Sequence, residues 1–97
     1  MKEREEVINL FDIYKELLTE KQQNYFKNYY FEDLSLSEIS DNLNVSKTMV
    51  GKTIKLIENK LYEYESILHN LENKNKLIEI INNIDDNNIK TKLKGLL

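Results

Sequence analysis

The stretch Leu34–Ile57 reads Leu-Ser-Leu-Ser-Glu-Ile-Ser-Asp-Asn-Leu-Asn-Val-Ser-Lys-Thr-Met-Val-Gly-Lys-Thr-Ile-Lys-Leu-Ile and has the pattern of a helix-turn-helix. Ser35 precedes Glu38 by three residues, which predicts a capping box at the start of a first helix. Ser46, eleven residues after Ser35, is a preferred N-cap for a second helix. Asn44 tolerates the left-handed backbone with which many helices end. We therefore predict two helices joined by a short turn, with the motif over residues 35–57.

The apolar residues of this stretch fit two helices that pack against each other. They lie four residues apart within each expected helix: Ile39 and Leu43 in the first, Val50 and Ile54 in the second. Val45 lies in the turn, where its side chain can fill the angle between the helices. A helix-turn-helix presents one face of its second helix to a partner, most often the DNA major groove.

The composition favours an all-α chain that forms one domain. The 97 residues include no Pro and only two Gly, so little interrupts helix formation. We expect no membrane insertion, because no apolar run approaches the length that spans a bilayer, and the charged N-terminus shows no signal peptide. The absence of Cys excludes disulfides and fits a cytoplasmic location. The net charge of −3 argues against a protein that coats nucleic acid without specificity.

The spacing of apolar residues predicts a helix-turn-helix domain over residues 1–70 and a C-terminal helical extension over residues 71–97. We expect the domain to contain three or four helices, of which the first runs from about Glu3 to Leu18. Thr19 and Gln22 form a second capping box, so another helix should begin there.

That next helix carries an aromatic stripe, which consists of Tyr25, Phe26, Tyr29 and Tyr30. We interpret the stripe as a core face that packs on the helix-turn-helix. The alternative is an exposed platform on which bases stack. Such a platform would need interleaved basic residues, and Lys27 alone does not supply them.

A long helix is predicted from Lys47 to about His69, and it carries a heptad seam. The apolar residues of the seam repeat at three- and four-residue spacing: Ile54, Ile57, Leu61, Tyr64, Leu68 and Leu71. The seam can pack on the chain's own helices or on a second copy. We expect a homodimer whose interface uses Ile57, Leu61, Tyr64 and Leu68, with a monomer whose tail folds back over the seam as the alternative.

The segment that follows the long helix is expected to bend and then continue as amphipathic helix. Residues 70–75 contain three Asn and suggest a helix end or kink. The tail beyond them could be a helical hairpin, a dimerisation element or an arm that lacks fixed structure.

The candidate nucleic-acid contacts lie on the first exposed turns of the long helix: Lys47, Thr48, Gly51, Lys52 and Lys55. In a recognition helix, positions near the N-terminus contact base edges and later cations contact phosphates. The alternative is that these lysines form an ordinary solvated face, since Arg and Gln, which read bases well, are absent.

No pattern in the chain indicates catalysis, a cofactor or a metal site. There is no Gly-rich phosphate loop, and no carboxylate pair is set beside a nucleophile. The single histidine, His69, has only Glu65 as a helical neighbour, which is too few ligands for a metal ion. We expect a protein that is not an enzyme.

Several segments of the chain resemble the YlxM family of small bacterial helix-turn-helix proteins, over roughly residues 7–68. The resemblance is carried by residues 17–22, residues 29–36, Glu38-Ile39, Val45-Ser46, Val50, Ile54-Lys55, Glu58, Leu61 and Tyr64-Glu65. The helix-turn-helix of this family is similar to the DNA-binding fourth region of sigma factors.

The resemblance implies a regulatory protein tied to the signal recognition particle pathway, because the family's gene is typically adjacent to those for the particle's GTPase and its receptor. Members of the family tend to have Arg-Gln where this chain has Lys47-Thr48, and Arg where it has Leu56. The residues that would read a target therefore differ. A second hypothesis is a protein-interaction module that binds the particle's GTPase, its RNA–protein complex or its receptor without binding DNA.

Overall fold

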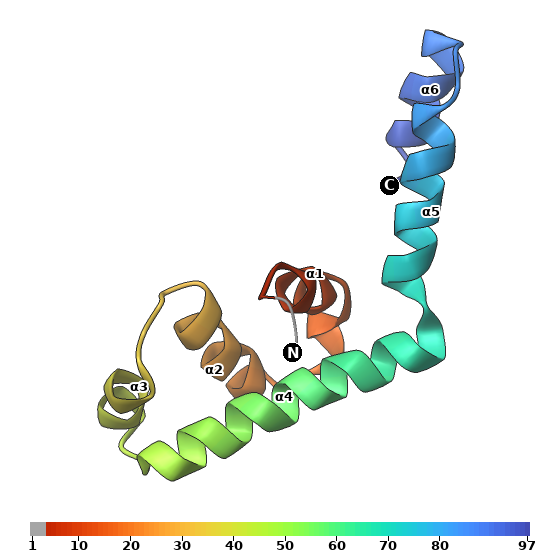
Figure 1. The fold of residues 1–97 in the computed structure, drawn as a ribbon. Helices are drawn as coiled ribbons and strands as arrows, with labels where there is room; N and C mark the ends of the chain where they lie inside the picture. The colour runs from red at the N-terminus through yellow and green to blue at the C-terminus, as the bar shows by residue number, and fades with distance from the viewer. Residues whose placement is uncertain (1–3) are drawn as a thin grey trace.

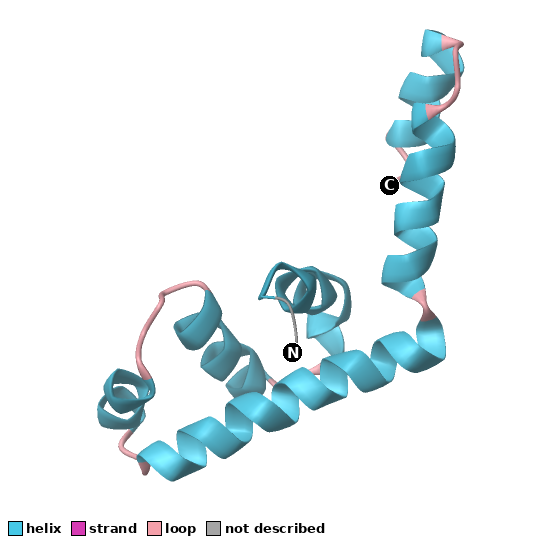
Figure 2. Ribbon diagram, viewed as in Figure 1, coloured by secondary structure: helices cyan, strands magenta, loops and turns pink. Residues whose placement is uncertain are grey.

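The computed structural model describes residues 4–97, and helices are the only regular elements in that part of the chain (Figures 1 and 2). The elements are α1 (Arg4–Tyr14), the short 3-10 helix η1 (Lys15–Leu17), α2 (Glu20–Tyr30), α3 (Leu36–Leu43), α4 (Lys47–Leu68), α5 (Asn70–Asn82) and α6 (Asn87–Lys94). The predicted all-α helix-turn-helix architecture is confirmed. The first helix ends earlier than expected, at Tyr14, and continues as a 3-10 turn; its expected start at Glu3 lies outside the described residues.

The helices α1, α2 and α3 gather on one side of the long helix α4 (Figure 1). The inner face of α4 buries four apolar side chains at three- and four-residue spacing: Val50, Ile54, Ile57 and Leu61. They meet the buried residues of the other helices, which are Val7, Leu10, Phe11, Tyr14, Leu18, Tyr25, Phe26, Tyr30 and Ile39. This core unites residues 4–68 into one domain, which we call the helix-turn-helix domain.

The aromatic stripe of α2 lies in this core, as predicted. The ring of Phe26 stacks on Phe11 of α1 with the ring centroids 4.1 Å apart, and on Tyr30 at 4.4 Å. Tyr25 is buried and Tyr29 is half-buried. The stripe therefore joins α1 and α2 to α4 and leaves no aromatic platform for bases.

The break between α4 and α5 is a single residue. His69 has the left-handed backbone angles φ 54° and ψ 27°, which end α4, and α5 begins at the next residue. The expectation of a helix end or kink across residues 70–75 is wrong, because these residues form the first turns of α5. Figure 1 shows α5 leaving the end of α4 at a steep angle.

A carboxylate from α4 fixes this corner. Glu65 accepts hydrogen bonds from the backbone N–H groups of Leu71 and Glu72, both at 3.0 Å, and so caps the start of α5. The hydroxyl of Tyr14 in α1 donates to Glu65 Oε1 at 2.6 Å and accepts from the Asn70 N–H at 3.2 Å. Partial burial raises the pKa of Glu65, but these hydrogen bonds outweigh it and hold the pKa below its ordinary value.

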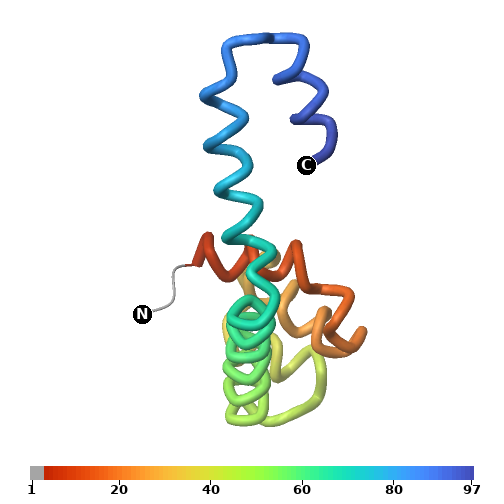
Figure 3. Tube along the Cα trace, turned by 90° about the vertical axis from the view of Figure 1, so that its right-hand side faces the viewer, coloured from red at the N-terminus to blue at the C-terminus, as the bar shows by residue number. Residues whose placement is uncertain are grey.

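The last two helices form a hairpin, residues 70–97, which we call the arm. Asp86 caps α6 by accepting from the N–H groups of Asn88 and Ile89, and α6 runs back alongside α5 (Figure 3). The arm stands away from the domain, and the Cα radius of gyration is 17.0 Å. A compact chain of this length would have about 13 Å, so the molecule is elongated.

Candidate nucleic-acid interface

The turn between α3 and α4 is fixed by local hydrogen bonds that the sequence specifies. Asn44 adopts the left-handed conformation, with φ 56° and ψ 46°, and ends α3 as expected. The Ser40 hydroxyl donates to the Val45 carbonyl oxygen at 2.7 Å, and Ser46 Oγ accepts from the Met49 N–H at 3.1 Å. These contacts set where α4 begins and how its first turn is directed.

The other end of α3 is held by the predicted capping box. Ser35 Oγ accepts from the Glu38 N–H at 3.1 Å, and Glu38 Oε1 accepts from the Ser35 N–H at 3.0 Å. The backbone hydrogen bond from Ser35 is the main reason that the pKa of Glu38 lies below its ordinary value. Helix α3 buries Ile39 completely in the core, so its position relative to α4 is set at both ends and in the middle.

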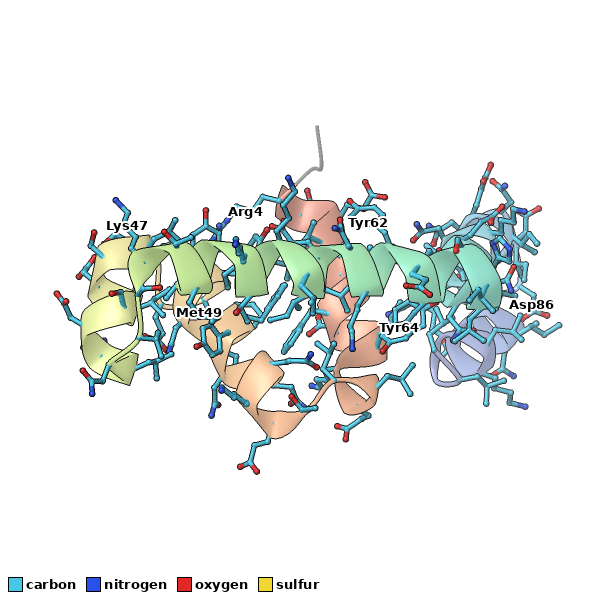
Figure 4. All side chains as sticks on the ribbon, turned by 90° about the horizontal axis from the view of Figure 1, so that it is seen from below. Arg4, Lys47, Met49, Tyr62, Tyr64 and Asp86 are labelled. Atoms are coloured by element: carbon cyan, nitrogen blue, oxygen red, sulfur yellow. The ribbon has the colours of Figure 1, made fainter. Side chains whose placement is uncertain are left out.

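Four of the five predicted nucleic-acid contacts are exposed on α4: Lys47, Thr48, Lys52 and Lys55. Figure 4 shows that no other helix of the described chain covers this side of α4, and that Lys47 lies at its N-terminal end. These four side chains, which together we call the lysine face, can therefore reach a flat or convex partner without any rearrangement of the fold.

Gly51 is placed differently from the other four. It is half-buried, and a Cβ added to it would lie 3.7 Å from Leu36 Cδ1 of α3. That separation is an ordinary van der Waals contact, so neither crowding nor backbone conformation requires glycine there. The expectation that Gly51 belongs to the exposed contact residues is corrected, because its position points at α3.

Glu58, three residues after Lys55 on α4, has a partner in another helix. Glu58 accepts a hydrogen bond from the Tyr30 hydroxyl in the domain interior. Burial, with Glu58 beside it, raises the pKa of Tyr30, so the hydroxyl remains a neutral donor. Arg4 donates to the Tyr30 carbonyl oxygen and to Asp33 Oδ1, the latter at 3.0 Å. Tyr30 thus engages Glu58, whereas Glu63 lies with Lys52 and Lys55 on the outer face of α4.

Comparison with known proteins identifies the family. Residues 1–95 match the family described as "UPF0122: Putative helix-turn-helix protein, YlxM / p13 like". This chain belongs to the UPF0122 family. The UPF0122 protein of Mycoplasma capricolum is 48% identical over 87 residues, which cover 90% of this chain and 77% of that protein. The UPF0122 protein of Ureaplasma urealyticum is 38% identical over 90 residues, or 93% of this chain and 91% of the relative.

The match to UPF0122 confirms the resemblance drawn from the sequence motifs and extends it. The relatives align through most of the arm as well as through the helix-turn-helix domain. In the described part of this UPF0122 chain no helix is long and apolar enough to cross a bilayer. Nor do residues 4–97 hold a group of three or more His, Asp or Glu side chains that could bind a metal ion.

The predicted dimer seam is largely used within the chain. Ile57 and Leu61 are 0% exposed because α1 and α2 cover them. The ring of Tyr64 packs 5.9 Å from that of Tyr14, and only Leu68, at 46% exposure, faces solvent. Ile57 and Leu61 therefore cannot form an interface with a second copy, and this part of the expectation is corrected.

Sequence reasoning missed the middle of the outer face of α4. Six residues line a shallow hollow there: Lys52, Lys55, Leu56, Asn59, Lys60 and Glu63. Leu56 is 47% exposed within this surface, although an apolar residue would be expected to turn inward. The signal was present in the sequence, since positions 52, 56, 59 and 63 recur at three- and four-residue spacing and mark one helical face.

Proposed function

We propose that this chain is a cytoplasmic helix-turn-helix regulator that binds nucleic acid through the start and outer face of α4. The contact residues are Lys47, Thr48, Lys52 and Lys55. The observation that supports the proposal is their common exposure on the side of α4 that no other helix of the described chain covers, at the end that the capped turn holds in place. No catalytic role is part of the proposal.

The position of each residue along α4 indicates whether it should contact bases or phosphates. Lys47 and Thr48 lie in the first turn, where a recognition helix reaches base edges. Lys52 and Lys55 lie one and two turns later, where cations hold the phosphate backbone and fix the register. Three lysines that each neutralise one phosphate give a slope of log affinity against log salt of about −3 on a DNA duplex.

A charge-reversal experiment tests the proposal. We expect the Lys52→Glu/Lys55→Glu variant to lose nearly all binding to DNA and RNA duplexes in fluorescence anisotropy titrations, while its far-UV circular dichroism remains helical. The matched control is Lys74→Glu/Lys76→Glu, which makes the same charge change on α5 and should bind as the natural chain does. Equal binding by both variants would remove this face of α4 from consideration.

The resemblance to the YlxM family supports a regulatory role in the signal recognition particle pathway. One observation favours a protein partner there as a second candidate function. The half-exposed Leu56 lies in the hollow among side chains of both charges, including Lys55 and Glu63, and such a mixture suits a protein surface better than a phosphate backbone.

Only the second candidate function gives Leu56 a direct role in binding. If the particle's GTPase, its complex or its receptor is the partner, a Leu56→Ala change should weaken a titration against that component and leave duplex binding intact. If nucleic acid is the target, the same change should leave duplex affinity within a factor of a few. Titration with and without the particle's RNA separates a direct protein contact from one that the RNA carries.

A further inference from the structure

The arm leaves half of its apolar side chains exposed. Among them Leu77 is 49% exposed, Ile80 61%, Ile89 51% and Leu96 82%. Leu77 and Ile80 lie on neighbouring turns of α5, while Ile89 and Leu93 share one face of α6 and Leu96 follows just after the end of that helix. We call these residues the arm face.

The arm cannot close a core of its own. Its two helices bury one apolar side chain, Ile81, to 4% exposure. Where the arm meets the domain, only Leu71 packs against the domain core. Segments below about 40 residues rarely hold a stable core without a disulfide, a metal or a second chain, and the arm has 28 residues, 70–97, and no cysteine.

The exposed area is larger than that of a closed monomer. The molecule exposes 6956 Å². A compact monomer of 11.6 kDa exposes about 5,800 Å², which leaves an excess of roughly 1,100 Å². Each partner in an interface of standard size contributes about 800 Å², so the elongated arm carries enough surface for one.

The charges of α6 are arranged so that a second copy of α6 complements the first. Asp85 and Asp86 stand at its start, and Lys90, Lys92 and Lys94 follow toward its end. When two copies lie antiparallel about a two-fold axis, the acidic start of each helix meets the basic end of the other. Their helix dipoles are then also opposed, which is the favourable orientation.

We propose that the arm face is covered by the arm of a second copy, so that two hairpins form an antiparallel four-helix bundle. In that arrangement Leu77, Ile80, Ile89 and Leu96 of both copies converge on a shared core, as in other bundles built from hairpins. The interface lies at the opposite end of α4 from Lys47, so both lysine faces stay open (Figure 4). The inference is independent of what the lysine face binds.

Sedimentation equilibrium of the full chain tests the proposal. We expect the mass to approach twice 11.6 kDa as the concentration rises through the micromolar range. The Leu77→Glu/Ile80→Glu variant should remain at the monomer mass with its helix content retained, because both side chains are exposed within one chain. The matched control, Leu17→Glu/Leu56→Glu, changes two residues of similar exposure outside the arm and should dimerise as before.

A charge swap adds a test that does not depend on apolar residues. Lys92→Glu/Lys94→Glu should weaken the dimer tenfold or more, because Glu then faces Asp85 of the partner copy. Adding Asp85→Lys should restore it. A mass of 11.6 kDa at every concentration would overturn the proposal, and so would a dimer that survives Leu77→Glu/Ile80→Glu or a swap that fails to restore pairing. Binding of the monomer to lipid vesicles through the same residues would likewise overturn it.

Discussion

The helix-turn-helix domain and the arm are both helical, but they differ in how they bury apolar surface. Among the residues that the structure describes, thirteen of the fourteen buried apolar residues lie in the domain, and Ile81 alone lies in the arm. In the domain three helices cover the inner face of one long helix, and the apolar side chains between them form a common core. In the arm two helices meet along one edge, and five apolar residues remain exposed: Leu77, Ile80, Ile89, Leu96 and Leu97. A single chain thus closes the core of the domain but leaves half of the arm's apolar side chains exposed.

The largest expected effect comes from truncating the domain core. Leu61→Ala should lower the free energy of unfolding by about 2–5 kcal/mol, because it removes a fully buried side chain and leaves a cavity. The matched change in the arm, Ile80→Ala, should cost under about 1 kcal/mol at concentrations where the chain is monomeric. Urea unfolding followed by circular dichroism measures both. Equal losses of unfolding free energy in the two variants would contradict the claim that the domain has a closed core and the arm does not.

The next effect should appear at the corner between the two regions. Glu65→Ala leaves the N–H groups of Leu71 and Glu72 without their acceptor and takes a partner from the Tyr14 hydroxyl. We expect a loss of about 1–3 kcal/mol that is concentrated in the arm. Hydrogen exchange should show faster exchange in α5 with little change in α2 and α3. Uniform acceleration across the chain would instead mean that the corner and the domain unfold together.

The same carboxylate makes the corner sensitive to acid. The pKa of Glu65 in the folded chain is lower than its ordinary value of 4.5. The ionised carboxylate therefore stabilises the folded corner fully above pH 4.5. The contribution is lost as the pH falls through the folded pKa. Protection of the first turn of α5 should therefore decline in the natural chain as the pH falls below 4.5. Glu65→Gln, which has no proton to gain, should show a flatter profile over the same range.

The features of the fold that could be predicted are those that depend on contacts between residues close together in the sequence. The caps at Thr19, Ser35 and Ser46 and the left-handed Asn44 follow from residues within three or four positions, and all are observed. The predicted end of the long helix near His69 is also observed, but the start of α5 at the very next residue could not be predicted in the same way. It depends on Glu65 reaching the amides of α5 and on Tyr14, which is 51 residues from Glu65.

The candidate site shows the same limit. Helical spacing placed the lysines on the outside of α4 correctly, but it could not show that α3 approaches Gly51 through Leu36. The heptad seam was recognised as apolar, yet a pattern alone does not state whether α1 and α2 or a second copy covers Ile57 and Leu61. Only the packing of the whole domain decides between those partners.

The smallest expected effect separates structure from function at Gly51. Gly51→Ala should stabilise the domain by about 0.5–1 kcal/mol, because alanine favours the helix and its Cβ fits beside Leu36. Thermal unfolding measures the change. Duplex affinity should stay the same, since the position points at α3. A stabilised chain that no longer binds would show that the close approach of a partner's backbone requires glycine there.

The contrast between a closed domain and an open arm is tested most directly by hydrogen exchange at two concentrations of the full chain, one below and one above dimer formation. Amides of α2 and of the buried half of α4 should exchange at the same rate in both samples. Amides of α5 and α6 should exchange faster in the dilute sample and become protected in the concentrated one. Arm amides that are equally protected at both concentrations would contradict the account, because the arm would then be complete within a single chain.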